Sequence, residues 1–180
     1  MNYAQLVRLP APGSINTGVS PARVSTQIQI FGKPGRLTQD CKETSAPAKV
    51  RELLETRDVG PFRLRGVKPW LDVCEKVYAE VKKDHPELYS QLVTAGCFCA
   101  RLVRGSATQP SNHTFGTATD HGVKVIDRRG DGKVQRGLLV LYSYFKKHKA
   151  YWGAEYRIED AMHFEASNEL LIDWKRRGLV

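Results

Sequence analysis

The sequence predicts an α+β fold in which helices pack against a small antiparallel sheet. Apolar residues recur at helical spacing over residues 70–81 and again over 134–145, which indicates two amphipathic helices. Strand-like segments lie at 94–104, at 122–126 and at 162–165. The chain has 180 residues, 41% hydrophobic and 26% charged, which is typical of one globular domain with a substantial core.

Residues 1–58 are predicted to form a loop-rich N-terminal extension, and residues 59–180 the main domain. Prolines and glycines punctuate residues 10–35, which favours loops and short extended pieces. Within the extension, alternating apolar residues over 23–31 predict a strand, and residues 49–55 a short helix. No repeat or binding motif is visible there, so we expect the extension to pack on the main domain.

The remaining elements of the main domain are shorter. A break at Asp84-His85-Pro86 precedes a second short helix that begins at residue 87. Residues 127–132 resemble part of a calcium loop but lack its third and fifth acidic ligands and its closing Glu, so they predict a polar turn. A closing helix is predicted over residues 167–177.

The formal net charge of +9 predicts attraction to polyanions, but the positive residues are scattered along the chain. No basic helix is interleaved with base-stacking aromatics, so specific nucleic-acid binding is not expected. No apolar run approaches the roughly 20 residues that cross a bilayer. The first residues lack a basic head followed by an apolar core, so a standard secretion signal is not expected.

The four cysteines, Cys41, Cys74, Cys97 and Cys99, do not have the spacing of a zinc-binding framework. Cys97 and Cys99 are predicted to lie on the same face of a strand with apolar neighbours, and buried free thiols are the expected state. Disulfides remain the alternative for a secreted protein, and the sequence does not pair them.

Two stretches contain the residues that carry chemistry: PSNHTFGTATD, which ends at Asp120, and DAMHFE, which begins at Asp160. A catalytic zinc ion takes three protein ligands, drawn from histidine nitrogen and carboxylate oxygen, and keeps one position open for water. It also needs a carboxylate outside the ligand set to take that water's proton. We therefore predict that His113, Asp120 and His163 bind the metal. Asp160 is the predicted general base.

The spacing within the first stretch has physical reasons. A turn must fold His113 and Asp120 back onto one metal ion. Gly116 and Ala118 are predicted to leave room where the backbone approaches the ion or the substrate. Ser111 is predicted to hydrogen-bond the substrate or a ligand, with formation of the loop as the equal alternative.

Bacterial cell-wall zinc peptidases carry a signature that this chain resembles in Ser111, His113, Gly116, Ala118 and Asp120, followed by Asp160 and His163. This family comprises D-alanyl-D-alanine carboxypeptidases and L-alanyl-D-glutamate endopeptidases, and its fold is shared with the signalling domain of Hedgehog. The resemblance extends over residues 60–174. It implies the same three metal ligands and the same catalytic aspartate. It also implies an arginine that holds the substrate carbonyl, and that role falls on Arg104.

Two positions depart from the family pattern, which has aliphatic residues where this chain has Thr119 and His121. His121 directly follows Asp120 and should point the other way on a strand. We therefore do not expect His121 among the ligands, although a place in the wall of the cleft stays open.

Other residues are predicted to support the site. Glu165 lies two residues after His163 and so on the same strand face, where it would hold the second imidazole nitrogen or else be a surface acid. Trp152 is predicted to be a wall of the substrate cleft or, equally, a core residue. Glu155 and Glu159 are rivals for the role of general base, but Glu159 would point away on an extended segment.

The two motifs predict a zinc-dependent hydrolase, and the resemblance implies a peptidase that hydrolyses peptidoglycan stem peptides. The short second motif, with Asp rather than Glu, and the missing secretion signal favour an L-alanyl-D-glutamate endopeptidase that reaches the wall by phage-lysis-type release or contact delivery. A D-alanyl-D-alanine carboxypeptidase is the alternative with the same metal site. A non-catalytic zinc-containing binding module is the alternative of another class, which the presence of Asp160 and Arg104 disfavours. Peptidoglycan peptides and anionic wall polymers are the expected partners.

Overall fold

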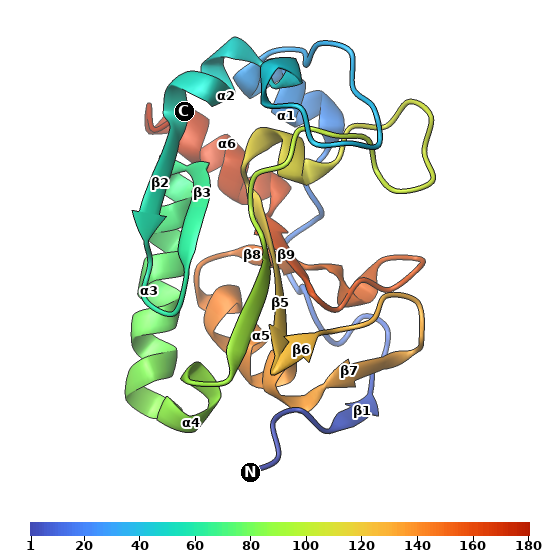
Figure 1. Ribbon diagram of the computed structural model, residues 1–180, viewed down its shortest axis with the longest axis vertical. Coiled ribbons are helices and arrows are strands. Elements are labelled where there is room, and N and C mark those ends of the chain that lie inside the picture. The colour runs from blue at the N-terminus through green and yellow to red at the C-terminus, as the bar shows by residue number, and fades with distance from the viewer.

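The computed structural model describes residues 1–180 and has a five-stranded antiparallel sheet at its centre (Figure 1). The strand order is β4 (Leu92–Gly96), β5 (Ala118–Val123), β9 (His163–Ala166) and β8 (Ala150–Trp152), and β6 (Val125–Ile126) pairs with β5. Two smaller antiparallel pairs join β1 (Leu6–Arg8) to β7 (Lys133–Gln135) and β2 (Leu54–Asp58) to β3 (Arg63–Val67).

Six α-helices surround these strands: α1 (Val24–Phe31), α2 (Ala48–Leu53), α3 (Lys68–Asp84), α4 (Pro86–Tyr89), α5 (Arg136–Lys147) and α6 (Asn168–Arg176). Three short 3-10 turns complete the fold: η1 (Glu43–Ser45), η2 (Asn112–Phe115) and η3 (Gly153–Glu155). The predicted α+β fold with a small antiparallel sheet is confirmed.

The helices α3 and α5 pack against one face of the central sheet and form the core with it. Trp70 of α3 stacks on Phe145 of α5 with 5.8 Å between ring centroids, and Phe145 stacks on Phe164 of β9 at 4.8 Å. All three rings are fully buried. Because side chains alternate across a strand, Phe164 on this face turns His163 and Glu165 to the opposite face of the sheet.

The helices predicted from apolar periodicity are confirmed. The helix α3 begins at Lys68, holds Pro69 in its first turn and ends at Asp84, just before the predicted break. The helix α5 forms as predicted, and the three shorter predicted helices are α2, α4 and α6.

The strand predicted over residues 23–31 is wrong, because this segment forms the helix α1. Its buried residues are Gln27, Ile30 and Phe31, whose spacing of three and four places them on one helical face. That face packs against α6 and η2. The alternation of apolar residues suggested a strand, but tertiary packing selects the helix.

The strand predicted over residues 94–104 ends early, at Gly96. The register of β4 shifts between Thr94 and Gly96, and Gly96 has a φ of 105°, so the chain leaves the sheet there. The strand predicted over residues 122–126 is divided into β5 and β6 by Lys124, which has a φ of 63°.

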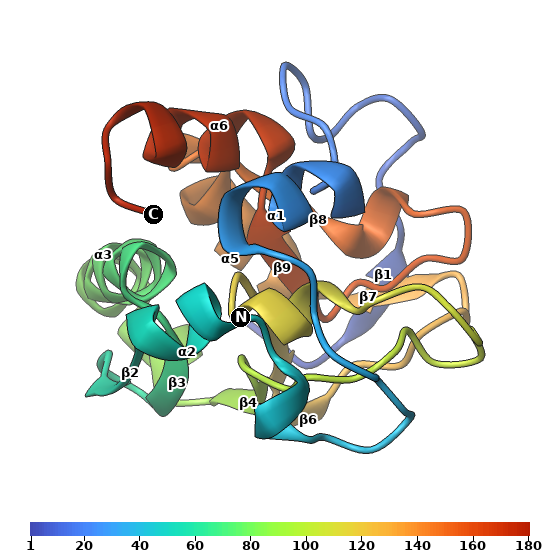
Figure 2. The ribbon, with the colours of Figure 1, turned by 90° about the horizontal axis from the view of Figure 1, so that it is seen from above.

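Residues 1–58 run along the main domain and are tied to it at several points. The strand β1 pairs with β7, and α1 lies beside α6 (Figures 1 and 2). Asn16 donates from Nδ2 to the main-chain oxygen of Trp152 and accepts from its N–H. The hairpin of β2 and β3 crosses the predicted boundary after residue 58, since its strands pair from Leu54 to Asp58.

The cysteines differ from the prediction of free thiols in one pair. Cys41 and Cys99 form a disulfide, whereas Cys74 and Cys97 are free and buried. Because the chain leaves the sheet at Gly96, Cys97 and Cys99 do not share a strand face. The disulfide instead connects the N-terminal extension to the segment that leads to His113.

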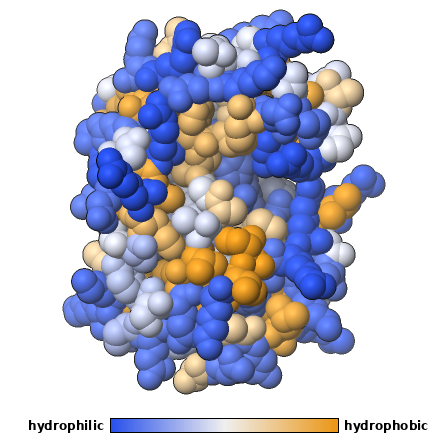
Figure 3. All heavy atoms as spheres, viewed as in Figure 1, coloured by the Kyte–Doolittle hydropathy of each residue, from blue (hydrophilic) through white to orange (hydrophobic).

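None of the helices is long and apolar enough to cross a bilayer. Figure 3 shows polar residues over most of one face of the molecule, with apolar residues gathered near its middle. The large apolar side chains are mostly in one buried cluster behind this surface, as expected of one globular domain.

Candidate active site

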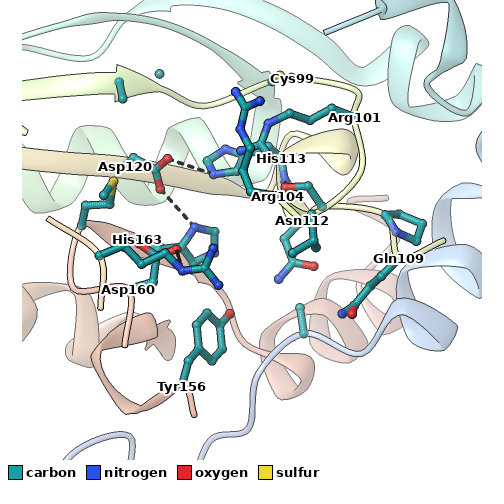
Figure 4. Close-up of a pocket in the computed structure, with 18 of the residues that line it drawn as sticks. Cys99, Arg101, Arg104, Gln109, Asn112, His113, Asp120, Tyr156, Asp160 and His163 are labelled. Carbon is teal, nitrogen blue, oxygen red and sulfur yellow. Dashed lines mark hydrogen bonds and ion pairs between the residues drawn. The ribbon is translucent and has the colours of Figure 1, made fainter. Parts of the chain in front are cut away.

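Three predicted ligands converge on one point at the face of the sheet opposite α3 and α5 (Figure 4). His113 Nε2 lies 3.2 Å from one carboxylate oxygen of Asp120, and His163 Nδ1 lies 3.1 Å from the other. One ligand atom from each residue lies within 4.8 Å of the other two. Asp120 and His163 are direct partners in the pairing of β5 with β9, while η2 carries His113.

His113 is positioned by main-chain groups. The turn η2 begins after Ser111, whose Oγ accepts from the main-chain N–H of His113. The ring nitrogen Nδ1 donates to the carbonyl oxygen of Cys97 at 2.6 Å. Because a carbonyl can only accept, Nδ1 carries a proton, and Nε2 is the ring nitrogen that faces Asp120.

His163 is positioned by a carboxylate. Its Nε2 donates to Glu165 Oε2 at 3.0 Å, so the predicted contact between Glu165 and the second imidazole nitrogen is present. Burial lowers the pKa of His163, but hydrogen bonds to Asp120 and then Glu165 outweigh it and raise the pKa to about 10.

Asp120 has the complementary shift. Burial acts to raise its pKa, but the facing rings of His113 and His163 hold the pKa well below its usual value. The metal-free protein therefore holds a positive ring against a carboxylate at the point where the ligand atoms meet.

This arrangement fits a zinc ion. The outer nitrogen of each histidine is bonded to an acceptor, which leaves Nε2 of His113 and Nδ1 of His163 as the inward atoms, and Asp120 adds a carboxylate oxygen. Two nitrogens and one oxygen with a remaining open side are the donor set of a catalytic zinc site. These three residues would hold the ion in place of the proton that His163 now shares with Asp120.

Asp160, the predicted general base, lies in the same pocket. Its Oδ1 is buried without a hydrogen-bond partner, and its Oδ2 lies 3.5 Å from Nε of Arg129. Burial raises the pKa of Asp160 from its usual value. A buried carboxylate oxygen without a donor is suited to accept a proton from a reacting group.

The two alternative general bases, Glu155 and Glu159, accept hydrogen bonds from other parts of the chain. Glu159 accepts from the main-chain N–H of Asp131 at 2.9 Å, and Glu155 accepts from the N–H of Gly13 at 2.8 Å. Neither lines the pocket around the three ligands. The geometry therefore favours Asp160 over both.

The pocket has a volume of about 900 Å³, and arginines are prominent in its wall. They are Arg101, Arg104, Arg129 and Arg157. A peptide with several carboxylates would find charge partners on more than one side of the metal ligands.

Arg101 also lines the pocket, and the sequence analysis did not single it out beside Arg104. Arg104 is exposed and its Nη1 donates to the carbonyl of Gln39 at 3.3 Å. Arg101 is half-buried. Burial and the charge of Arg104 lower the pKa of Arg101, while the carboxylates of Asp120 and Asp160 raise it. No sequence signal marked Arg101, because the predicted strand continued through it.

Trp152 does not lie in the pocket, so its predicted place in the cleft wall is wrong and its alternative as a core residue holds. It is fully buried, stacks on Phe164, and donates from Nε1 to the carbonyl of Ala161 at 2.7 Å. Tyr156 lines the pocket instead, and burial followed by the charge of Glu165 raises its pKa well above the usual value. Ser111 lines the pocket as predicted, in addition to capping η2.

The two small residues of the first stretch are needed for packing away from the pocket, not for approach to an ion. Gly116 has a φ of 64°, and a Cβ there would lie 3.0 Å from the main-chain nitrogen of Val67. Ala118 is fully buried. Neither residue lines the pocket, so the predicted reason for both is wrong.

Thr119 and His121 face the helix α3, as the alternation of the strand predicts. Trp70 Nε1 donates to Thr119 Oγ1 at 2.8 Å, and the hydroxyl of Tyr78 shares a 2.6 Å hydrogen bond with His121 Nε2. Burial lowers the pKa of His121 to about 4. His121 therefore belongs to the core and not to the pocket wall, and polar partners on α3 compensate for the missing aliphatic residues.

Comparison with known proteins agrees with this geometry. Residues 104–166 match the model of a family described as D-alanyl-D-alanine carboxypeptidase. The match covers about a third of the chain, and this segment is similar to that family of zinc peptidases. The family resemblance and the metallopeptidase predicted from the two motifs are thereby confirmed, and the segment includes all three ligands and Asp160. No curated protein matches the chain.

Proposed function

We propose that the protein is a zinc-dependent endopeptidase that cuts peptidoglycan stem peptides between L-alanine and D-glutamate. The observation that carries the proposal is the unpaired, buried Oδ1 of Asp160 beside the three ligands His113, Asp120 and His163. This combination supplies a metal site and a separate proton acceptor in one pocket, which is what metal-assisted hydrolysis requires.

The residues have distinct roles in this mechanism. When bound, zinc supplies a Lewis acid that polarises the scissile carbonyl and activates water. Asp160 accepts the proton of the attacking water through Oδ1 and later passes it to the leaving amine. Arg129, at 3.5 Å from Oδ2 of Asp160, keeps that carboxylate oriented.

Arg101 is our candidate for the group that stabilises the carbonyl oxygen as it becomes negative. It is half-buried, and burial followed by the charge of Arg104 lowers its pKa, although the carboxylates of Asp120 and Asp160 act in the opposite direction. Arg104, the residue that the family resemblance implied, is exposed at the rim and would bind a more distant part of the substrate.

The distribution of arginines supports an endopeptidase. A D-glutamate residue after the scissile bond carries a carboxylate that an L-alanine or D-alanine side chain lacks. Arg129 and Arg157 lie in the pocket wall together with Arg101 and Arg104, so more than one charged partner is available in the pocket. A D-alanyl-D-alanine carboxypeptidase would need a partner for only the terminal carboxylate.

The decisive experiment is mass spectrometry of stem peptides after incubation with the zinc-loaded protein, with and without a zinc chelator. Chelator-sensitive cleavage after L-alanine supports the endopeptidase, and loss of a single D-alanine would support the carboxypeptidase instead. No cleavage of any stem peptide by zinc-loaded protein would favour a zinc-containing binding module.

Two substitutions distinguish the loss of a metal ligand from the loss of the general base. We expect His113→Ala to lose both zinc and turnover, because a ligand is removed. We expect Asp160→Ala to keep zinc and lose turnover by about 100-fold or more, since general base catalysis contributes factors of about 10²–10⁴. An active Asp160→Ala enzyme would contradict the assignment of the base.

A further inference from the structure

Glu165, the carboxylate behind His163, is fully buried and receives three hydrogen bonds. His163 Nε2 and Asn112 Nδ2 both donate to Oε2, and the main-chain N–H of Ala22 donates to Oε1 at 2.9 Å. Two of these donors therefore come from outside the strand that carries Glu165. One is the residue that precedes His113, and the other belongs to the N-terminal extension.

Asn112 is in turn held by Gln27, which lies on α1. Because a carboxylate only accepts, Glu165 fixes the amide of Asn112 with Nδ2 toward it and Oδ1 away. The remaining acceptor of the amide, Oδ1, receives a hydrogen bond from Gln27 Nε2 at 2.7 Å. The order of donors and acceptors from Gln27 through Asn112 and Glu165 to His163 is thus determined along the whole path.

The burial of Gln27 is not explained by stability. Its side chain is fully buried, and its Oε1 has no hydrogen-bond partner. A buried acceptor without a donor is costly, and an apolar residue of similar size would avoid that cost. The contact to Asn112 is the interaction that the amide provides at this position and that leucine would not.

We propose that Gln27 and Asn112 are positioning residues of the metal centre, and that the N-terminal extension thereby sets the zinc affinity of the protein. This inference rests on the proposed zinc site. The two amides orient Glu165, and Glu165 orients His163 with Nδ1 toward the ion. The extension is on this account part of the active site rather than an attached arm.

The test measures zinc affinity of the metal-free protein by competition with a chromophoric chelator, together with thermal unfolding. Partners of this kind, removed one at a time, weaken metal binding by about 10–100-fold. We expect Asn112→Ala to weaken zinc binding by about 10-fold and Gln27→Leu by a smaller factor. Gln27→Leu should not lower the unfolding temperature of the metal-free protein, because it removes a buried unpaired oxygen. Zinc affinity that is unchanged in both variants would overturn the proposal.

Two further comparisons exclude a general packing effect. In the double variant, Gln27→Leu should add nothing to the loss caused by Asn112→Ala, because both act along one path. Gln27→Glu keeps the shape but replaces the donor by an acceptor, and it should weaken zinc binding at least as much as Gln27→Leu. Additive losses in the double variant, or wild-type affinity in Gln27→Glu, would contradict the path.

Gln135→Leu is the matched control. Gln135 is also buried, but its side chain bonds Val123 and Val125 of the β5–β6 hairpin, away from the pocket. This variant should lose stability and keep its zinc affinity, and an equal loss of affinity here would overturn the proposal. Because no step uses a peptide substrate, failure of the proposed peptidase activity would leave the affinity result intact, and the reverse also holds.

Discussion

The two histidines of the candidate metal centre are held by different means. His113 lies on the 3-10 turn η2, and its outer nitrogen donates to a main-chain carbonyl, that of Cys97, at 2.6 Å. His163 lies on the central strand β9, and its outer nitrogen donates to a side-chain carboxylate, that of Glu165, at 3.0 Å. A substitution can remove the carboxylate but not the carbonyl.

This difference indicates which kind of substitution can displace each of the two histidines. The position of His113 depends on the path of the chain over residues 97–101, which hydrogen bonds from Cys99 N to His113 O and from Ser111 N to Arg101 O hold against η2. The position of His163 depends on the network of side chains around Glu165. Changes to the backbone path should therefore act through His113, and single side-chain substitutions through His163.

Among the substitutions that compare the two sides, the largest effect on turnover is expected from Arg101, which belongs to the His113 side. Its carbonyl also accepts from Thr114 Oγ1 at 2.9 Å, so its main chain is fixed to η2, and the residue lines the pocket from there. Arg101→Ala should reduce kcat by about 10²–10³-fold, the usual loss for one oxyanion donor, with zinc affinity unchanged.

Arg104→Ala is the matched control for Arg101, since both line the same pocket. Because Arg104 is exposed, its removal should act mainly on KM. A larger loss of kcat in Arg104→Ala than in Arg101→Ala would restore the role that the family resemblance implied for Arg104.

The next effect concerns the backbone path that holds His113. The disulfide joins Cys41 to Cys99 across a sequence separation of 58, and Cys99 donates its N–H to His113 O. Cys41→Ser should lower the free energy of unfolding by about 2–4 kcal/mol, as expected for a loop of this length. A thiol reductant should destabilise the wild type by the same amount and leave Cys41→Ser unchanged in a denaturant titration. Equal sensitivity of both proteins to the reductant would show that another bond is responsible.

On the other side, Glu165→Gln tests the carboxylate that holds His163. The amide is nearly isosteric but can present a donor to Nε2, which disturbs the tautomer with Nδ1 facing the ion. We expect zinc affinity to fall by about 10–100-fold, with the Cys41–Cys99 disulfide intact. Competition with a chelator measures the change in zinc affinity. A Glu165→Gln variant with wild-type zinc affinity would show that the carboxylate does not hold His163, contrary to the difference described between the two histidines.

The sequence predicted the parts of the fold that depend on local pattern. The helices α3 and α5 follow from apolar spacing, and the orientation of Glu165 and His121 follows from alternation along β9 and β5. The convergence of His113, Asp120 and His163, with Asp160 in the same pocket, was predicted from residue type, spacing and the family resemblance. These are properties of short segments, so no knowledge of distant contacts was required.

The errors arise where contacts between segments distant in the sequence determine the local structure. The helix α1 was predicted as a strand because its packing against α6 and η2 is invisible in its own residues. The Cys41–Cys99 pair and the place of Arg101 in the pocket lining both depend on the chain leaving the sheet at Gly96. The cleft wall and the core stayed open as alternatives for Trp152 because sequence does not show which side of β8 faces Phe164.

The smallest expected effect is on stability and compares two carboxylates of the His163 side. Glu165 is buried with three donors, whereas Oδ1 of Asp160 is buried with none. Burial raises the pKa of Asp160, so the folded protein binds its proton more tightly than the unfolded chain does. The ionised form therefore destabilises the fold at all pH values above the raised pKa, and this cost disappears as the pH falls below the ordinary value.

Asp160→Asn should for this reason stabilise the metal-free protein near neutral pH, by about 0.5–2 kcal/mol, while it abolishes the proton acceptor. The gain should shrink as the pH is lowered toward 3.8, the ordinary pKa of the carboxyl group. Thermal unfolding of both proteins between about pH 4 and pH 7 measures the difference, which follows the ionisation of the carboxylate in the wild type. A loss of stability at neutral pH would mean that the ion pair with Arg129 outweighs burial, and that Asp160 is held for structure rather than poised for proton transfer.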